Sequence, residues 1–97
     1  MTPALIKEAA KIIEALEAEI EQAAYHNKTG DHIHFEDGKI YFSIVGFKCD
    51  LAELTEYKAW EQTRHALRSV LARIEPDFYN FNFHNMETHL EIEPKYQ

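Results

Sequence analysis

The fold of this chain is decided by the stretch His32-Ile33-His34-Phe35-Glu36-Asp37-Gly38-Lys39-Ile40-Tyr41-Phe42-Ser43-Ile44. Two alternating segments meet at Asp37-Gly38, a dipeptide that favours a two-residue hairpin turn because the turn needs positive φ angles. Successive side chains of a strand point to opposite faces, so the pairing sorts apolar from polar residues. One face then carries only Ile33, Phe35, Ile40, Phe42 and Ile44.

A second alternating stretch near the C-terminus predicts another hairpin. Residues 79–84 and 89–93 pair through residues 85–88, which sets Phe83 opposite Leu90 and Phe81 opposite Ile92. This register also separates apolar from polar side chains.

An amphipathic helix of about 23 residues is predicted from Pro3 to near Tyr25-His26, ahead of the first hairpin. Thr2 suits the N-cap and Pro3 the first turn, and apolar residues recur at three- and four-residue steps. Such a helix is about 35 Å long, whereas strands of about seven residues reach about 23 Å. We therefore expect it to overhang the sheet, and we expect either this helix or an edge strand of the sheet to contact a second subunit. The residues expected at that contact are Ile13, Leu16, Ile20 and Trp60.

A second amphipathic helix is predicted for residues 51–74. Asp50 and Glu53 form a capping-box pattern at its start, and Pro76 ends it. A break in the helix is expected near Thr55.

Between the first hairpin and the second helix, the alternation changes phase at Gly46. A bulge at this glycine would return Phe47 and Cys49 to the buried side. Cys49 then packs as a small apolar residue rather than acting as a nucleophile.

The predicted order is helix, strand, strand, helix, strand, strand. This αββαββ order predicts one α+β domain over residues 1–97, a two-layer sandwich with both helices on the apolar face of antiparallel hairpins. A chain of 97 residues is long enough for a single core.

The net charge of −7 argues against direct binding to nucleic acid or to an anionic membrane, because both need a basic surface. A single cysteine excludes an intramolecular disulfide and fits a reducing compartment. No apolar run approaches the length of a membrane span. We therefore expect a soluble cytoplasmic protein without a cofactor.

The polar face of the predicted sheet collects four of the six histidines. Histidines two residues apart on a strand point the same way, and directly opposed residues are about 5 Å apart at Cβ, which permits a transition-metal or small-ligand site. The weak candidates for such a site are His32, His34, His84 and His89. Protonation of all six histidines would change the formal charge from −7 to −1, so a pH response is a further hypothesis.

The function predicted from the sequence is a small acidic, non-enzymatic protein-interaction module that forms a homodimer. One alternative is an acidic inhibitor that occupies the basic surface of a nucleic-acid-binding enzyme, because the first helix and the tail are rich in glutamate. The other is metal or small-ligand binding by the histidine face. No catalytic motif, Gly-rich phosphate loop or family signature occurs in the chain.

Overall fold

Two β-hairpins and the helices that cover them make up the fold, which a computed structural model describes for residues 1–96. The α+β class and the predicted order are confirmed, except that the second helix is divided into two. The elements are α1 (Pro3–Gln22), β1 (Ile33–Glu36), β2 (Lys39–Phe42), α2 (Leu51–Arg64), α3 (Ala66–Ile74), the 3-10 turn η1 (Glu75–Asp77), β3 (Phe81–Asn85) and β4 (Leu90–Pro94).

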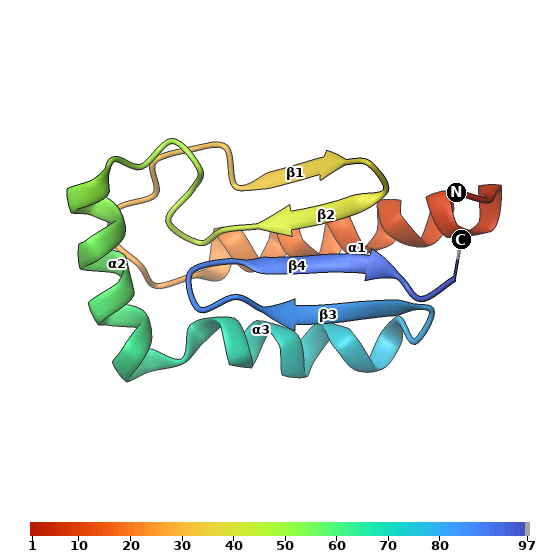
Figure 1. Cartoon of the computed structure of the whole chain (residues 1–97). Helices are drawn as coiled ribbons and strands as arrows, with labels where there is room; N and C mark the ends of the chain where they lie inside the picture. Colours follow the sequence, from red (N-terminus) through yellow and green to blue (C-terminus); the bar gives the residue numbers. More distant parts are fainter. Residues whose placement is uncertain (97) are drawn as a thin grey trace.

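The four strands form one antiparallel sheet in the order β1-β2-β4-β3, so each hairpin lies at one edge (Figure 1). The first hairpin has the predicted register, with Phe35 opposite Ile40 and Glu36 opposite Lys39. Its turn has φ angles of 52° at Asp37 and 77° at Gly38, as a primed two-residue turn requires.

The second hairpin differs from its predicted register by two residues. Phe83 lies opposite Ile92 rather than Leu90. The chain reverses more tightly than expected, because Glu87 has a φ of 73° and the N–H of Met86 bonds to the carbonyl of His89 at 2.9 Å. A shift of two residues leaves every side chain on its predicted face.

Helices α1 and α3 lie against the same face of the sheet, and α2 closes one end (Figure 1). The start of α1 and the end of β4 lie at the opposite end, where α1 extends beyond the strands (Figure 1). The core between the layers contains Ile12, Leu16, Ile40, Phe42, Tyr57, Leu67, Leu90 and Ile92, all with 0% exposure.

The helix boundaries follow from local capping. The hydroxyl of Thr2 accepts a bond from the N–H of Leu5, and Asp50 forms the predicted capping box with Glu53. The break expected near Thr55 instead occurs at His65, whose left-handed φ of 51° ends α2 and starts α3.

The predicted bulge at Gly46 is wrong. Strand β2 ends at Phe42, and Gly46 lies in a buried turn with a φ of 97°, against the backbone of Gly30. Phe47 consequently lies on the open face of the sheet, where its ring meets that of His34 at 4.9 Å. Cys49 is half-buried against the core.

None of the helices formed by residues 1–96 combines the length and apolar character that a bilayer crossing requires.

Candidate functional site: the exposed side of strand β1 and helix α1

Strand β1 has apolar side chains on the helix-facing side of the sheet that the helices do not fully cover. The Phe35 residue is 49% exposed, whereas its cross-strand neighbour Ile40 is 0% exposed and the next residue in the same row, Ile92, is also 0% exposed. Helix α1 packs against β1 and β2, and helix α3 packs against β3, but β1 forms an edge of the sheet and its outer side is only partly covered (Figure 1). A single exposed apolar side chain is common on protein surfaces, but a contiguous patch of them is typical of an interaction site.

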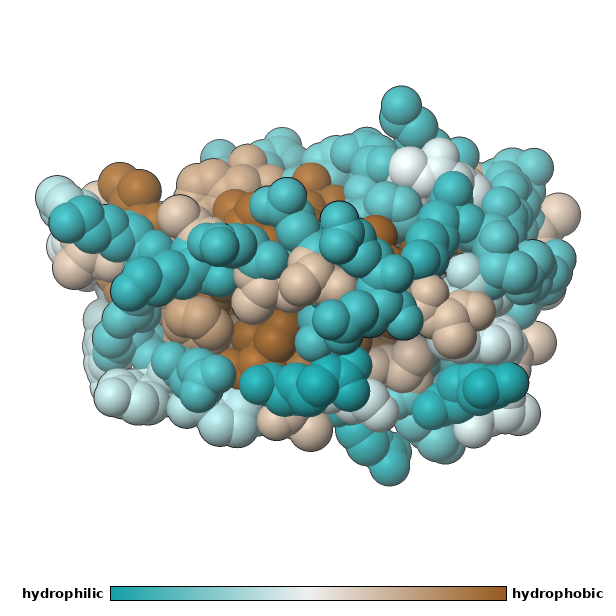
Figure 2. Space-filling model, turned by 180° about the vertical axis from the view of Figure 1, so that it is seen from behind, coloured by the Kyte–Doolittle hydropathy of each residue, from teal (hydrophilic) through white to brown (hydrophobic). Residues whose placement is uncertain are grey.

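A groove of about 530 Å³ separates β1 from α1. We call it the α1–β1 groove; it is lined by Ile13, Glu17, Ile20, Glu21, His32, Ile33 and Phe35. The isoleucines and Phe35 make it largely apolar, and the two glutamates add an acidic border. Figure 2 shows apolar surface between hydrophilic side chains on this helix-covered face of the molecule.

The apolar surface continues past Phe35 toward the N-terminus. Phe35 also borders a smaller hollow of about 240 Å³, together with Met1 and Ile6. These two residues are 44% and 52% exposed. The exposed apolar residues therefore extend over two adjoining hollows along α1.

The outer edge of β1 has no strand partner within residues 1–96. The N–H of Ser43 donates to the carbonyl of His32 at 2.8 Å. Because hydrogen bonding alternates along an antiparallel pair, the backbone groups of Ile33 and Phe35 point away from β2. Unpaired N–H and C=O groups of this kind are a template for strand addition by another chain.

The residues predicted at a subunit contact divide into three locations. Ile13 and Ile20 line the α1–β1 groove. Leu16 is 0% exposed, which places it in the core and corrects its expected position at the surface. Trp60 lies away from the groove. It belongs to an aromatic cluster in which the centroid of its ring is 4.9 Å from that of Tyr25.

Sequence reasoning missed Ile33 and Phe35 as interface residues. Their alternation with polar residues indicates the apolar face, and both were therefore assigned to the core. The missing information was which edge strand the helices leave partly uncovered: β1 is one edge of the sheet, whereas Phe81 on the other edge strand, β3, is only 2% exposed.

Two of the candidate histidines lie on the open face of the sheet, and each has a carboxylate neighbour. His34 Nε2 is 2.9 Å from Oδ2 of Asp31, and His84 Nε2 is 3.4 Å from Oε1 of Glu93. They belong to opposite edge strands, β1 and β3, so two strands separate them.

The other two candidates have different surroundings. His32 lines the α1–β1 groove rather than the open face, and its Nδ1 is 2.8 Å from the carbonyl oxygen of Ser43. His89 faces the ring of Phe47, with 6.1 Å between the centroids. The four histidines do not converge, and residues 1–96 contain no group of three or more His, Cys, Asp or Glu side chains arranged to hold a metal ion.

Neither the hydroxyl of Ser43 nor the thiol of Cys49 is placed to act as a nucleophile. The hydroxyl of Ser43 is buried and accepts a bond from the N–H of Gly46 at 2.9 Å, while the ring of His32 faces the Ser43 backbone. Burial raises the pKa of the Cys49 thiol, and the nearby carboxylate of Glu53 raises it further. A raised pKa lowers the thiolate fraction at neutral pH, which lowers reactivity.

Comparison with known proteins finds neither a family model that matches the chain nor a curated protein that matches it. The α1–β1 groove and the free edge of β1 are therefore the basis for the function inferred below.

Proposed function

We propose that the protein is a non-enzymatic interaction module that forms a homodimer through the α1–β1 groove and the free edge of β1. The observation that supports this most directly is the 49% exposure of Phe35 beside the fully buried Ile40. Full burial of an exposed phenylalanine side chain contributes about 1.5–3 kcal/mol, so burial of the exposed half of Phe35 contributes about half as much. We further propose the cytoplasm as its compartment, because a chain with a single cysteine fits a reducing environment.

A second copy of the chain suits this surface because the β1 edge is self-complementary. In the dimer, the β1 strands of the two copies pair antiparallel, with His34 of one copy opposite His34 of the other. Ile33 of each copy then lies opposite Phe35 of its partner copy. Both residues direct their backbone groups outward, so each gains hydrogen-bond partners in this register. A two-fold contact of this kind closes on itself and gives a dimer rather than a fibre.

The charge of the chain predicts how salt affects this dimer. Each copy carries a formal charge of −7, so two copies repel one another at long range. Added salt screens the repulsion between exposed charges and leaves apolar burial in place. We expect the dimer to tighten as salt is raised.

The test is the mass in solution, measured by sedimentation or light scattering. We expect the unmodified protein to have twice the chain mass of 11.4 kDa, and Phe35→Lys to have the mass of one chain. Leu51→Lys is the matched control, because Leu51 is 79% exposed but lies at the start of α2, away from the groove. A single-chain mass for the unmodified protein at high concentration would defeat the proposal.

A second candidate is an acidic inhibitor that covers the basic surface of a nucleic-acid-binding protein. It is favoured by three exposed carboxylates along α1, those of Glu14, Glu17 and Glu21. Binding of this kind weakens with salt and is competed by DNA. Its salt response is therefore opposite in sign to that of the homodimer, and binding that DNA does not reduce would reject it.

A further inference from the structure

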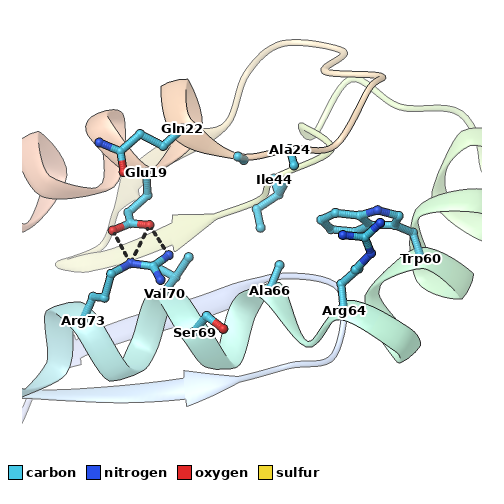
Figure 3. Close-up of a pocket in the computed structure, with 11 residues that line it drawn as sticks. Glu19, Gln22, Ala24, Ile44, Trp60, Arg64, Ala66, Ser69, Val70 and Arg73 are labelled. Carbon is cyan, nitrogen blue, oxygen red and sulfur yellow. Dashed lines mark hydrogen bonds and ion pairs between the residues drawn. The ribbon is translucent and has the colours of Figure 1, made fainter.

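A separate pocket of about 410 Å³ lies on the other flank of α1, between the end of that helix, α2 and α3 (Figure 3). Its volume lies within the range of about 300–1,000 Å³ that is usual for small-molecule sites. Ile44, Ala66 and Val70 give it an apolar lining, and Ile44 and Val70 are themselves buried. We call it the α1–α3 pocket.

One end of the α1–α3 pocket is an aromatic wall with a cation in front of it. The ring of Trp60 packs against those of Tyr25 and Tyr57, with centroids 4.9 and 5.7 Å away, so the wall is held by its neighbours. The guanidinium carbon of Arg64 is 5.9 Å from the centroid of the Trp60 ring (Figure 3). Within residues 1–96, Arg64 forms no ion pair with a carboxylate.

The other end of the pocket carries a cation that is already neutralised. Nε of Arg73 donates to Oε2 of Glu19 at 2.9 Å, and Nη2 donates to Oε1 at 2.6 Å (Figure 3). The two arginines and one glutamate that line the pocket therefore sum to a charge of +1 in a chain of net −7. The uncompensated charge is that of Arg64.

We propose that the α1–α3 pocket binds a small monocarboxylate with an apolar body. The carboxylate accepts hydrogen bonds from the guanidinium of Arg64, whose planar set of donors matches a carboxylate. The apolar body lies over Ala66 and Val70, beside the Trp60 wall. This site is independent of the homodimer contact, because the residues that line it are not shared with the α1–β1 groove.

The charge balance selects a monoanion. A single negative charge brings the sum of the charges that line the pocket to zero, whereas a phosphate dianion would bring that sum to −1. A neutral ligand would cover Arg64 without supplying a negative charge to its guanidinium, and hydrogen bonds between two charged groups are stronger than those to a neutral acceptor. The apolar lining disfavours a ligand that is polar throughout.

The probe for this site is phenylacetate, compared with its neutral analogue phenylacetamide. We expect saturable binding of phenylacetate by calorimetry, with a parallel change in the fluorescence of Trp60, the single tryptophan of the chain. The amide should bind at least about tenfold more weakly than the acid, because a hydrogen bond between charged groups is worth about that factor.

Three variants locate the site. Arg64→Gln should weaken phenylacetate binding about tenfold, whereas Lys58→Gln, which removes a cation of α2 outside the pocket, should leave it unchanged. Ala66→Leu should abolish binding by filling the pocket, while circular dichroism and the unfolding temperature show that the fold remains. Calorimetry is the deciding readout, because loss of Arg64 also changes the surroundings of Trp60.

Three results would overturn the carboxylate site. They are the absence of saturation by phenylacetate at millimolar concentrations, equal binding of acid and amide, and equal losses in Arg64→Gln and Lys58→Gln. Phe35→Lys serves as a cross-check, because it should abolish the homodimer and leave phenylacetate binding as it is.

Discussion

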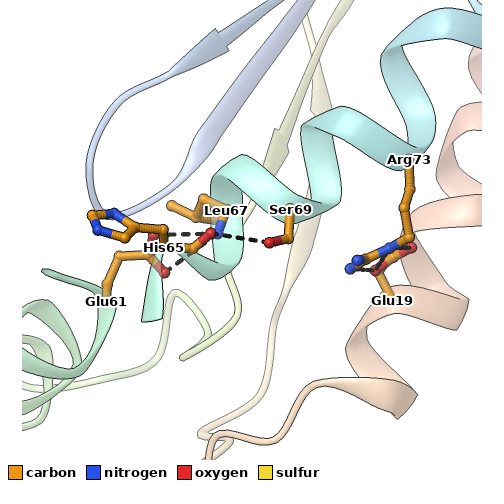
Figure 4. Close-up of polar contacts among 6 residues, drawn as sticks. All are labelled: Glu19, Glu61, His65, Leu67, Ser69 and Arg73. Carbon is orange, nitrogen blue, oxygen red and sulfur yellow. Dashed lines mark hydrogen bonds and ion pairs between the residues drawn. The ribbon is translucent and has the colours of Figure 1, made fainter. Parts of the chain in front are cut away.

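The carboxylate of Glu61 joins α2 to α3, and its removal should destabilise the whole domain. Glu61 is 8% exposed, and its Oε1 accepts a bond from the hydroxyl of Tyr57 at 3.0 Å. Its two oxygens also lie 3.3 and 3.2 Å from the backbone nitrogen of Leu67 (Figure 4). Because His65 provides no side-chain cap for α3, Glu61 caps that helix from the end of the preceding one.

The size of the effect of Glu61→Ala follows from these contacts. Loss of an N-cap costs about 1 kcal/mol, and loss of a hydrogen bond to a charged acceptor costs about 1.5–3 kcal/mol. The sum is about 3 kcal/mol, out of a free energy of unfolding of about 5–15 kcal/mol for a domain of this size. At about 4–8 °C for each kcal/mol, the midpoint of thermal unfolding should fall by about 12–24 °C.

Urea unfolding followed by Trp60 fluorescence measures this loss. The control is Glu56→Ala, because Glu56 lies on the same helix but is exposed and pairs only with exposed His26, at 2.9 Å. An exposed pair contributes about 0–1 kcal/mol. If the two variants lose the same free energy of unfolding, Glu61 does not cap α3 in the way described.

Two further predictions concern the core and its surroundings. Gly46→Ala should cost about 2–5 kcal/mol, because Gly46 has a φ of 97° and an added Cβ would meet the backbone of Gly30. Gly30→Ala, which meets only the flexible Lys48 at 3.7 Å, should cost less in the same denaturation experiment; the reverse order would contradict the close approach. Burial raises the pKa of the Tyr57 phenol, and the charge of Glu61 raises it further. The stability that Tyr57 contributes to the fold is therefore fully present below pH about 10, the pKa of a tyrosine in the unfolded chain, and it declines at higher pH. Tyr57→Phe should therefore show a shallower alkaline loss of stability, and an unchanged slope would refute this assignment.

The local parts of the fold were predictable because they depend on neighbouring residues. Asp37-Gly38 defines both the turn and the register of the first hairpin, and the capping pattern at Asp50 defines the start of α2. The second hairpin has no such dipeptide. Side-chain alternation is unchanged by a shift of two residues, so only the conformation of the turn at Glu87 distinguished the observed register from the predicted one.

The candidate site depended on information that periodicity does not carry. Alternation assigned Phe35 to the apolar face correctly, but it does not show whether a helix covers that part of the face. The stripe of α1 likewise did not separate Leu16, which is in the core, from Ile13 and Ile20, which line the groove. The histidine site was a hypothesis that depended on the strand order as well as on alternation. His34 and His84 lie on opposite edge strands, and His32 precedes β1, which begins only at Ile33 after the positive φ of 59° at Asp31.

The strand order β1-β2-β4-β3 also has a consequence for how fast the chain folds. Each hairpin closes through a short turn, and hairpins of this kind form in about 1–10 μs. The junction between β2 and β4 instead joins Ile40 to Ile92, which are 52 positions apart in the sequence. Closing a flexible loop of that length costs about 3.5 kcal/mol in chain entropy, so docking of the two finished hairpins, rather than formation of either, should limit the rate of folding.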